Sequence, residues 1–157
     1  SVTQEITGGT LTASITAATL TSVTYSNVLQ TNTGALTLNV SDARGTSQGW
    51  NVTVSSTDFI YQVGGPSANP SNIPATGFSV VTPATPVMVA GQAVDGTNGP
   101  VAGTGGALSS ARQVISSAAD YGSGDYTQVL PVSLAIPALS QTGTYVATLT
   151  VNVSSGP

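Results

Sequence analysis

Apolar residues alternate with Thr and Ser along most of this chain, and this period of two constrains the fold more than any other feature. Leu36, Leu38 and Val40 take every second position of one run. The same alternation recurs at 11–15, 50–54, 129–136 and 145–153. Successive side chains of a strand point to opposite faces of a sheet, so each run predicts a strand with one buried face. Helix-favouring residues are scarce, with no Lys and one Met.

These runs predict an all-β fold, an antiparallel β-sandwich of about seven to nine strands, immunoglobulin-like or jelly-roll-like. The length of 157 residues suits a single domain over 1–157. Runs 36–40 and 50–54 are expected to pair as a hairpin across a polar loop. The remaining expectations are strands at 20–25, 78–81 and 87–89, long Gly/Pro-rich loops at 64–77 and 90–110, and either a short helix or an edge strand within 108–119.

Charged residues make up only 5% of the chain, against about a quarter in an ordinary soluble domain. A formal net charge of −4 without a basic cluster excludes an electrostatic basis for binding nucleic acid or anionic lipid. The sequence holds neither a run of about 18 apolar residues nor a signal-peptide pattern, so no membrane span is expected. A mature exported protein, located outside the cell at its surface, fits this composition.

The chain lacks the residues that most often perform catalysis near neutral pH. It has no His, Cys or Lys, so we expect neither an enzyme nor a cofactor. Asp120 and Asp125 flank a Gly-rich tip that could ligate Ca²⁺ through carboxylate and carbonyl oxygens. An acidic turn beside two tyrosines is the simpler interpretation, and it leaves the chain without a metal site.

Three residues around the loop at 41–49 are expected to be structural. Trp50 begins an apolar stripe, which favours a plug between the two sheets over a surface ring that stacks on wall glycans. Asp42 and Arg44 are two residues apart and are expected to form a clasp. Asn39, Asn51 and Asn152 match the N-glycosylation pattern, but each lies within an expected strand, which favours chance matches in a Thr/Ser-rich chain.

The stretch 36–59 contains Asp42-Ala-Arg-Gly-Thr46 followed by Gly49-Trp-Asn-Val-Thr-Val54. It resembles the Asp-x-Arg-Gly-Thr and Gly-Trp segment of WxL-type surface domains, and the ending 143–153 resembles their closing strand. The resemblance implies an exported bacterial β-sandwich associated with cell-wall binding. Trp50-Asn51-Val52 stands at the first WxL position, whereas Val151-Asn152-Val153 stands at the second, where the family has Trp.

The first residues form an alternating segment ahead of Gly8. Val2, Gln4 and Ile6 would share one face of a strand, and Leu11, Ala13 and Ile15 continue the pattern. Such a segment can add to an open sheet of a neighbouring copy, and head-to-tail addition that does not close makes a fibre. We therefore expect a donor strand at 1–7, extending up to 15, in a homopolymeric pilus-like surface filament. An N-terminal strand within its own sandwich is the competing interpretation, and a peptidoglycan-binding module is the alternative function.

Overall fold

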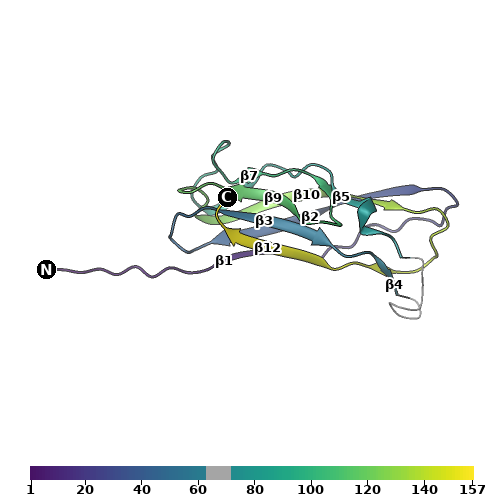
Figure 1. Cartoon of the computed structure of the whole chain (residues 1–157), viewed down its shortest axis with the longest axis horizontal. Helices are drawn as coiled ribbons and strands as arrows, with labels where there is room; N and C mark the ends of the chain where they lie inside the picture. The colour runs from purple at the N-terminus through teal and green to yellow at the C-terminus, as the bar shows by residue number, and fades with distance from the viewer. Residues whose placement is uncertain (63–71) are drawn as a thin grey trace.

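The computed structural model describes residues 1–62 and 72–157 and confirms an all-β sandwich (Figure 1). All of its strand pairs are antiparallel, and the described residues contain no α-helix, only the 3₁₀ turn η1 (Ala75–Gly77). Part of the loop expected at 64–77 lies outside the described residues. The strands form two larger sheets and one small pair.

The first sheet is organised around two long strands, β2 (Gln30–Asp42) and β10 (Gly124–Ile136), which pair over their full lengths. β1 (Leu11–Ile15) pairs with the outer side of β2. On the other side of β10 lie β5 (Phe78–Val80), followed by β8 (Gly106–Ala107), and separately β6 (Val87–Gly91).

The second sheet has the order β12, β3, β9, β7. Its strands are β12 (Leu149–Ser155), β3 (Trp50–Ser56), β9 (Arg112–Ser117) and β7 (Val101–Ala102). A separate two-stranded pair, β4 (Ile60–Tyr61) with β11 (Tyr145–Val146), lies at one end of the sandwich (Figure 1).

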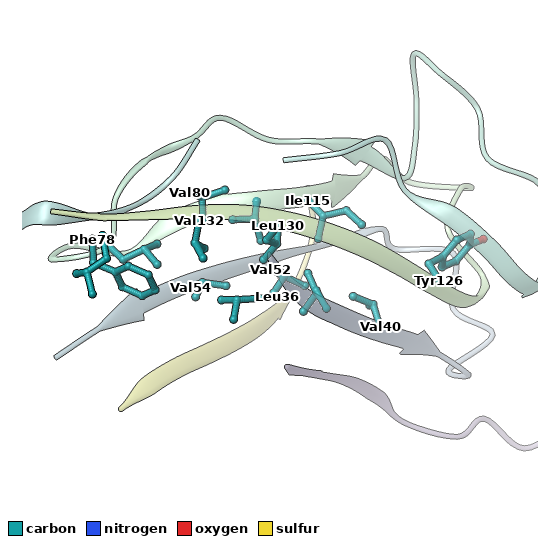
Figure 2. Packing of buried hydrophobic residues seen from close by; sticks show 14 of the residues in the cluster. Leu36, Val40, Val52, Val54, Phe78, Val80, Ile115, Tyr126, Leu130 and Val132 are labelled. Atoms are coloured by element: carbon teal, nitrogen blue, oxygen red, sulfur yellow. The ribbon is translucent and has the colours of Figure 1, made fainter. Parts of the chain in front are cut away.

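The alternating residues supply the core between the sheets. Leu36 and Leu130 face one another across β2 and β10, and both are buried, as is Val52 on β3. Figure 2 shows these side chains meeting in the space between the sheets. Intervening positions such as Thr37 and Asn39 are exposed, as the period of two requires.

Two local expectations are wrong, and a third is right only in part. Runs 36–40 and 50–54 do not form a hairpin, because β2 pairs with β1 and β10 while β3 pairs with β12 and β9 in the other sheet. Residues 20–25 form no strand. Within 108–119 the chain forms a strand and no helix, but β9 is not an edge strand, because it lies between β3 and β7.

The expected donor region divides into two parts at Gly8 and Gly9. Leu11, Ala13 and Ile15 belong to β1, which pairs with β2 of the same chain, so their role as intermolecular anchors is a wrong expectation. Residues 1–7 behave differently: all are exposed, and the segment extends away from the sandwich (Figure 1). The chain joins the sheet where the Gly9 N–H donates to the Ala43 carbonyl at 2.7 Å.

Trp50 is fully buried and spans the two sheets. It starts β3 in one sheet, and its ring centre lies 6.1 Å from that of Tyr126 on β10 in the other. Its indole N–H donates to the Gly122 carbonyl at 2.9 Å, so the polar atom of the ring is satisfied inside the core. This burial rules out a surface ring that stacks on a glycan.

Asp42 and Arg44 connect the sheets at the same end. The Arg44 guanidinium donates twice to the Asp42 carboxylate, from Nε to Oδ1 and from Nη2 to Oδ2, both at 2.9 Å. It also donates to the Gly49 carbonyl at 2.8 Å and to the Ser155 hydroxyl. Because Asp42 ends β2 whereas Gly49 precedes β3 and Ser155 ends β12, this clamp ties the first sheet to two strands of the second.

The clamp is ionised at neutral pH. The hydrogen bonds from Arg44 lower the pKa of Asp42 below 3.8, against the opposing effect of burial, and Asp42 in turn raises the pKa of Arg44. Since the folded pKa of Asp42 is lower than the unfolded one, the clamp stabilises the fold at pH values above the unfolded pKa. That contribution is lost as the pH falls through the folded pKa.

Replacing Arg44 tests the clamp. Arg44→Gln leaves the buried Asp42 carboxylate without its charged partner and is expected to lower the free energy of unfolding by about 3 kcal/mol at neutral pH. The difference from the unsubstituted protein should shrink as the pH falls below about 4. Urea unfolding at several pH values measures both. Arg112→Gln is the matched control, because Arg112 donates one side-chain hydrogen bond, to the Ala107 carbonyl; equal losses for the two variants would contradict the role of the clamp.

Replacing Trp50 tests its role as a plug. Trp50→Phe leaves the Gly122 carbonyl without its donor and opens space in the core, so we expect a folded protein that is less stable by about 2–4 kcal/mol. Tyr25→Phe, at a ring that is 55% exposed, should change stability by less than about 0.5 kcal/mol. Thermal and urea unfolding provide the comparison, and a Trp50→Phe protein of unchanged stability would be evidence against the plug.

Candidate functional site

A groove opens at the end of the sandwich that carries β4 and β11. It has a cavity volume of about 600 Å³ and lies between the segments 18–26 and 140–149. The first segment leads from β1 to β2, and the second leads from β10 through β11 to β12. The groove therefore lies between one connection within the first sheet and one connection that runs from the first sheet to the second.

The floor of the groove is apolar and belongs to the core. Phe59 and Phe78 meet edge to face, with ring centres 5.0 Å apart and an angle of 86° between the planes. Their neighbours on the floor are aliphatic residues from both sheets and from the chain before η1: Leu36, Ile73, Leu134, Ile136 and Leu149. A ligand in the groove would thus contact apolar side chains that are already fixed by packing.

The rim is polar and aromatic. Tyr25 is 55% exposed, and the Tyr145 ring lies 5.0 Å from that of Tyr61, between ring centres. The Tyr145 hydroxyl donates to the Gln141 carbonyl at 2.9 Å, and burial is the main reason that the pKa of Tyr145 is raised. The Asn32 amide holds the rim segment by donating to the Thr21 carbonyl at 2.8 Å.

None of the described residues that line this groove is charged. Its rim offers tyrosine rings, amides from Gln30, Asn32 and Gln141, and several Ser and Thr hydroxyls. Rings provide flat apolar contact, whereas amides and hydroxyls can each donate and accept hydrogen bonds. This combination suits an uncharged ligand that is rich in hydroxyl or amide groups.

The two candidate metal ligands, Asp120 and Asp125, lie outside this groove. Asp120 and Asp125 are both exposed, and Asp120 has a left-handed backbone with φ of 70°. Backbone atoms hold that turn: the Asp120 N–H donates to the Ser47 carbonyl, and its carbonyl accepts from the Gln92 amide, each at 2.9 Å. Among the described residues, no group of three or more His, Cys, Asp or Glu side chains lies close enough together to hold a metal ion.

The glycosylation-pattern residues also lie in strands. Asn39 and Asn152 are exposed, on β2 and β12 respectively. Asn51 is half-buried, and its amide donates to the Gly156 carbonyl at 3.0 Å. At the second WxL position, Val151 and Val153 pair with Val54 and Val52 and pack against the core.

Sequence reasoning missed the groove. Its walls include the segment expected to be a strand at 20–25 and the start of the run expected to be a strand at 145–153. The available signal was the break in strict alternation around 16–29, together with a tyrosine and several amides near both walls. No pattern indicated that segments more than a hundred residues apart would face one another.

The comparisons with known proteins give one match. The family model described as "WxL domain surface cell wall-binding" matches residues 2–157. No curated protein and no solved structure matches the chain. The described parts of the chain contain no helix that is long and apolar enough to cross a membrane.

This match agrees with the resemblance carried by Asp42, Arg44 and Trp50, and it extends over nearly the whole chain. In the structure these residues form the clamp and the plug that join the sheets, which explains why the segment is a recognisable part of the domain. A location at the cell surface follows from the family. The chain belongs to the WxL family of surface domains that bind the cell wall.

Proposed function

We propose that this chain is a non-catalytic module that attaches to the wall by holding an uncharged stretch of wall polymer, such as a peptidoglycan glycan strand, in the groove at the β4–β11 end. One observation carries the proposal: the groove combines an apolar floor with a rim of tyrosines, amides and hydroxyls, and the lining residues within 1–62 and 72–157 include no charged side chain. Sugars with N-acetyl groups present the matching hydroxyls, amides and apolar faces.

The net negative charge of the chain favours a neutral ligand over a wall polymer that carries phosphate groups. The net charge is −4, and the chain has only two cationic side chains. Arg44 is engaged in the clamp, and Arg112 donates to the Ala107 carbonyl. An anionic polymer would therefore meet net repulsion without a cationic cluster to offset it.

The proposal that the module is non-catalytic is supported by the composition of the chain and by the lining of the groove. The sequence contains no His, Cys or Lys, and the described part of the groove lining has no carboxylate that could act as an acid or base. A lining of this kind can bind a polymer but provides no proton-transfer group matched to neutral pH.

Tyr25 provides the test of the groove. Because Tyr25 is exposed at the rim, Tyr25→Ala should leave the fold intact. Its affinity for purified cell walls, measured by co-sedimentation, should fall about tenfold. Tyr121→Ala is the control, since Tyr121 is absent from the groove lining and lies in the turn at 118–124. Equal wall binding by the Tyr25 and Tyr121 variants would count against the groove as the wall site.

A second function, assembly of copies into a surface filament, is favoured by the segment 1–7. Val2 is fully exposed and Ile6 is 92% exposed. No hydrogen bond links residues 1–7 to the rest of the described chain. An alternating apolar segment without an intramolecular partner is the element that strand addition between copies requires.

Deleting residues 1–7 tests this second function. The shortened protein should keep the unfolding curve of the full chain, because the segment contributes nothing to the core. It should also lose self-association in sedimentation-velocity runs and lose fibres in negative-stain images. Fibres formed equally well by the shortened protein would exclude assembly through this segment.

A further inference from the structure

The first sheet has an unguarded edge at β6. All five residues of Val87–Gly91 are exposed. Within the described residues β6 pairs with one strand, β10, so its other side has no strand partner. Natural edge strands are usually protected by charged side chains, by proline or by very short length. The run Val87-Met88-Val89-Ala90 contains neither a charge nor a proline; Pro86 precedes it, and its ladder with β10 has one register shift.

An apolar patch surrounds this edge on the outer face of the sheet. Val87 is paired with Thr127, and Val129 follows two residues later on the same face of β10. Val87, Val89, Val129 and the nearby Val81 are between 46% and 63% exposed. Scattered exposed apolar residues are ordinary, but a cluster beside an unpaired strand edge indicates a contact surface.

We propose that the edge of β6 is the acceptor for residues 1–7 of a second copy of this chain. This inference rests on the second function proposed above, and it names the surface that receives the segment. Added as a further strand, the segment would place Val2, Gln4 and Ile6 on one face, beside Val87 and Val89 of β6. Its backbone would complete the unpaired side of β6.

The dimensions of the two elements match. Seven extended residues span about 23 Å and the five residues of β6 about 17 Å, at roughly 3.3 Å per residue. Glu5 would fall on the face opposite Val2 and Ile6, so the apolar patch would receive no charged residue from the segment. Both surfaces are apolar, exposed and unpaired in the single chain, and their contact would bury both.

The segment cannot reach this edge within its own chain. At the end where it leaves the sheet, pairing places Leu11, Asp42, Gly124 and Gly91 in one row across β1, β2, β10 and β6. Crossing to the far side of β6 takes four strand spacings, about 19 Å, which would use about six of the seven residues. Gly9 is held against Ala43, so too little chain would remain to pair.

The other edges of the described sheets are poorer acceptors. β7, β8, β4 and β11 have two residues each. β1 and β12 lie close to one another at the opposite side of the sandwich, so each partly shields the other (Figure 1). β6 therefore combines length, exposure and apolar character to a degree that the other edges lack.

Charge substitutions in the full chain test the pairing. Ile6→Glu breaks the donor, and Val87→Glu breaks the acceptor, because each would bury a carboxylate in an apolar contact. Each should raise the dissociation constant for self-association about tenfold or more, as measured by sedimentation equilibrium. Thr3→Glu on the opposite face of the segment and Val28→Glu, at a residue that is 62% exposed like Val87, should behave as the unsubstituted protein.

Mixing the two broken variants makes the test specific. The Ile6→Glu protein keeps its acceptor and the Val87→Glu protein keeps its donor, so the mixture should form a one-to-one complex that neither forms alone. Because the chain has no cysteine, Gln4→Cys and Val89→Cys copies can also be mixed and oxidised. A disulfide-linked pair is expected, whereas Gln4→Cys with Val28→Cys should stay unlinked.

The outcomes separate this inference from the function on which it rests. If Ile6→Glu abolishes association while Val87→Glu does not, the segment assembles copies but β6 is not its acceptor. If the unsubstituted protein stays monomeric at all concentrations, both proposals are overturned. Loss of wall sedimentation by Ile6→Glu with association unchanged would assign the segment to the wall and would also overturn the pairing.

Discussion

The ladder between β2 and β10 is the interaction on which the rest of the structure depends. Thirteen residues of each strand pair in register, from Gly124 with Asp42 to Ile136 with Gln30. Their inward side chains form one wall of the core. The free edge of β2 pairs with β1, and the free edge of β10 pairs with β5 and β6. Because the alternation has a strict period of two, a shift of the register by one residue would turn Leu36 and Leu130 outward, so burial fixes the pairing.

The sequence was sufficient to predict which face of each strand is buried but not which strands are neighbours. Alternation at 36–40 and 50–54 correctly indicated two half-buried strands, yet they belong to different sheets. The alternation shows that one face of each strand is covered by another layer, but it does not specify which strand pairs with the backbone at either edge. The groove was beyond prediction for a similar reason, since its walls come from 18–26 and 140–149, and their approach depends on the whole sandwich.

Several of the few charged residues are used in local structure and not on strand edges. Arg44 and Asp42 neutralise one another in the clamp, and Asp95 accepts from the Thr97 and Asn98 N–H groups within a turn. Little charge remains to protect strand edges, so solubility of the outer face depends on Thr, Ser and Asn. This is compatible with a surface domain whose edges are covered by other molecules, and it is a liability for an isolated monomer.

The wall groove and the proposed contact between copies lie at opposite ends of the long ladder, so one need not obstruct the other. Gln30 and Ile136 line the groove, whereas Asp42 and Gly124 mark the end where residues 1–7 depart. Thirteen residues of strand separate these ends by about 40 Å. Copies joined through β6 would therefore each keep an open groove. Several weak grooves linked in one assembly hold a repeating polymer far more tightly than one groove does, because after the first attachment the others bind at high effective concentration.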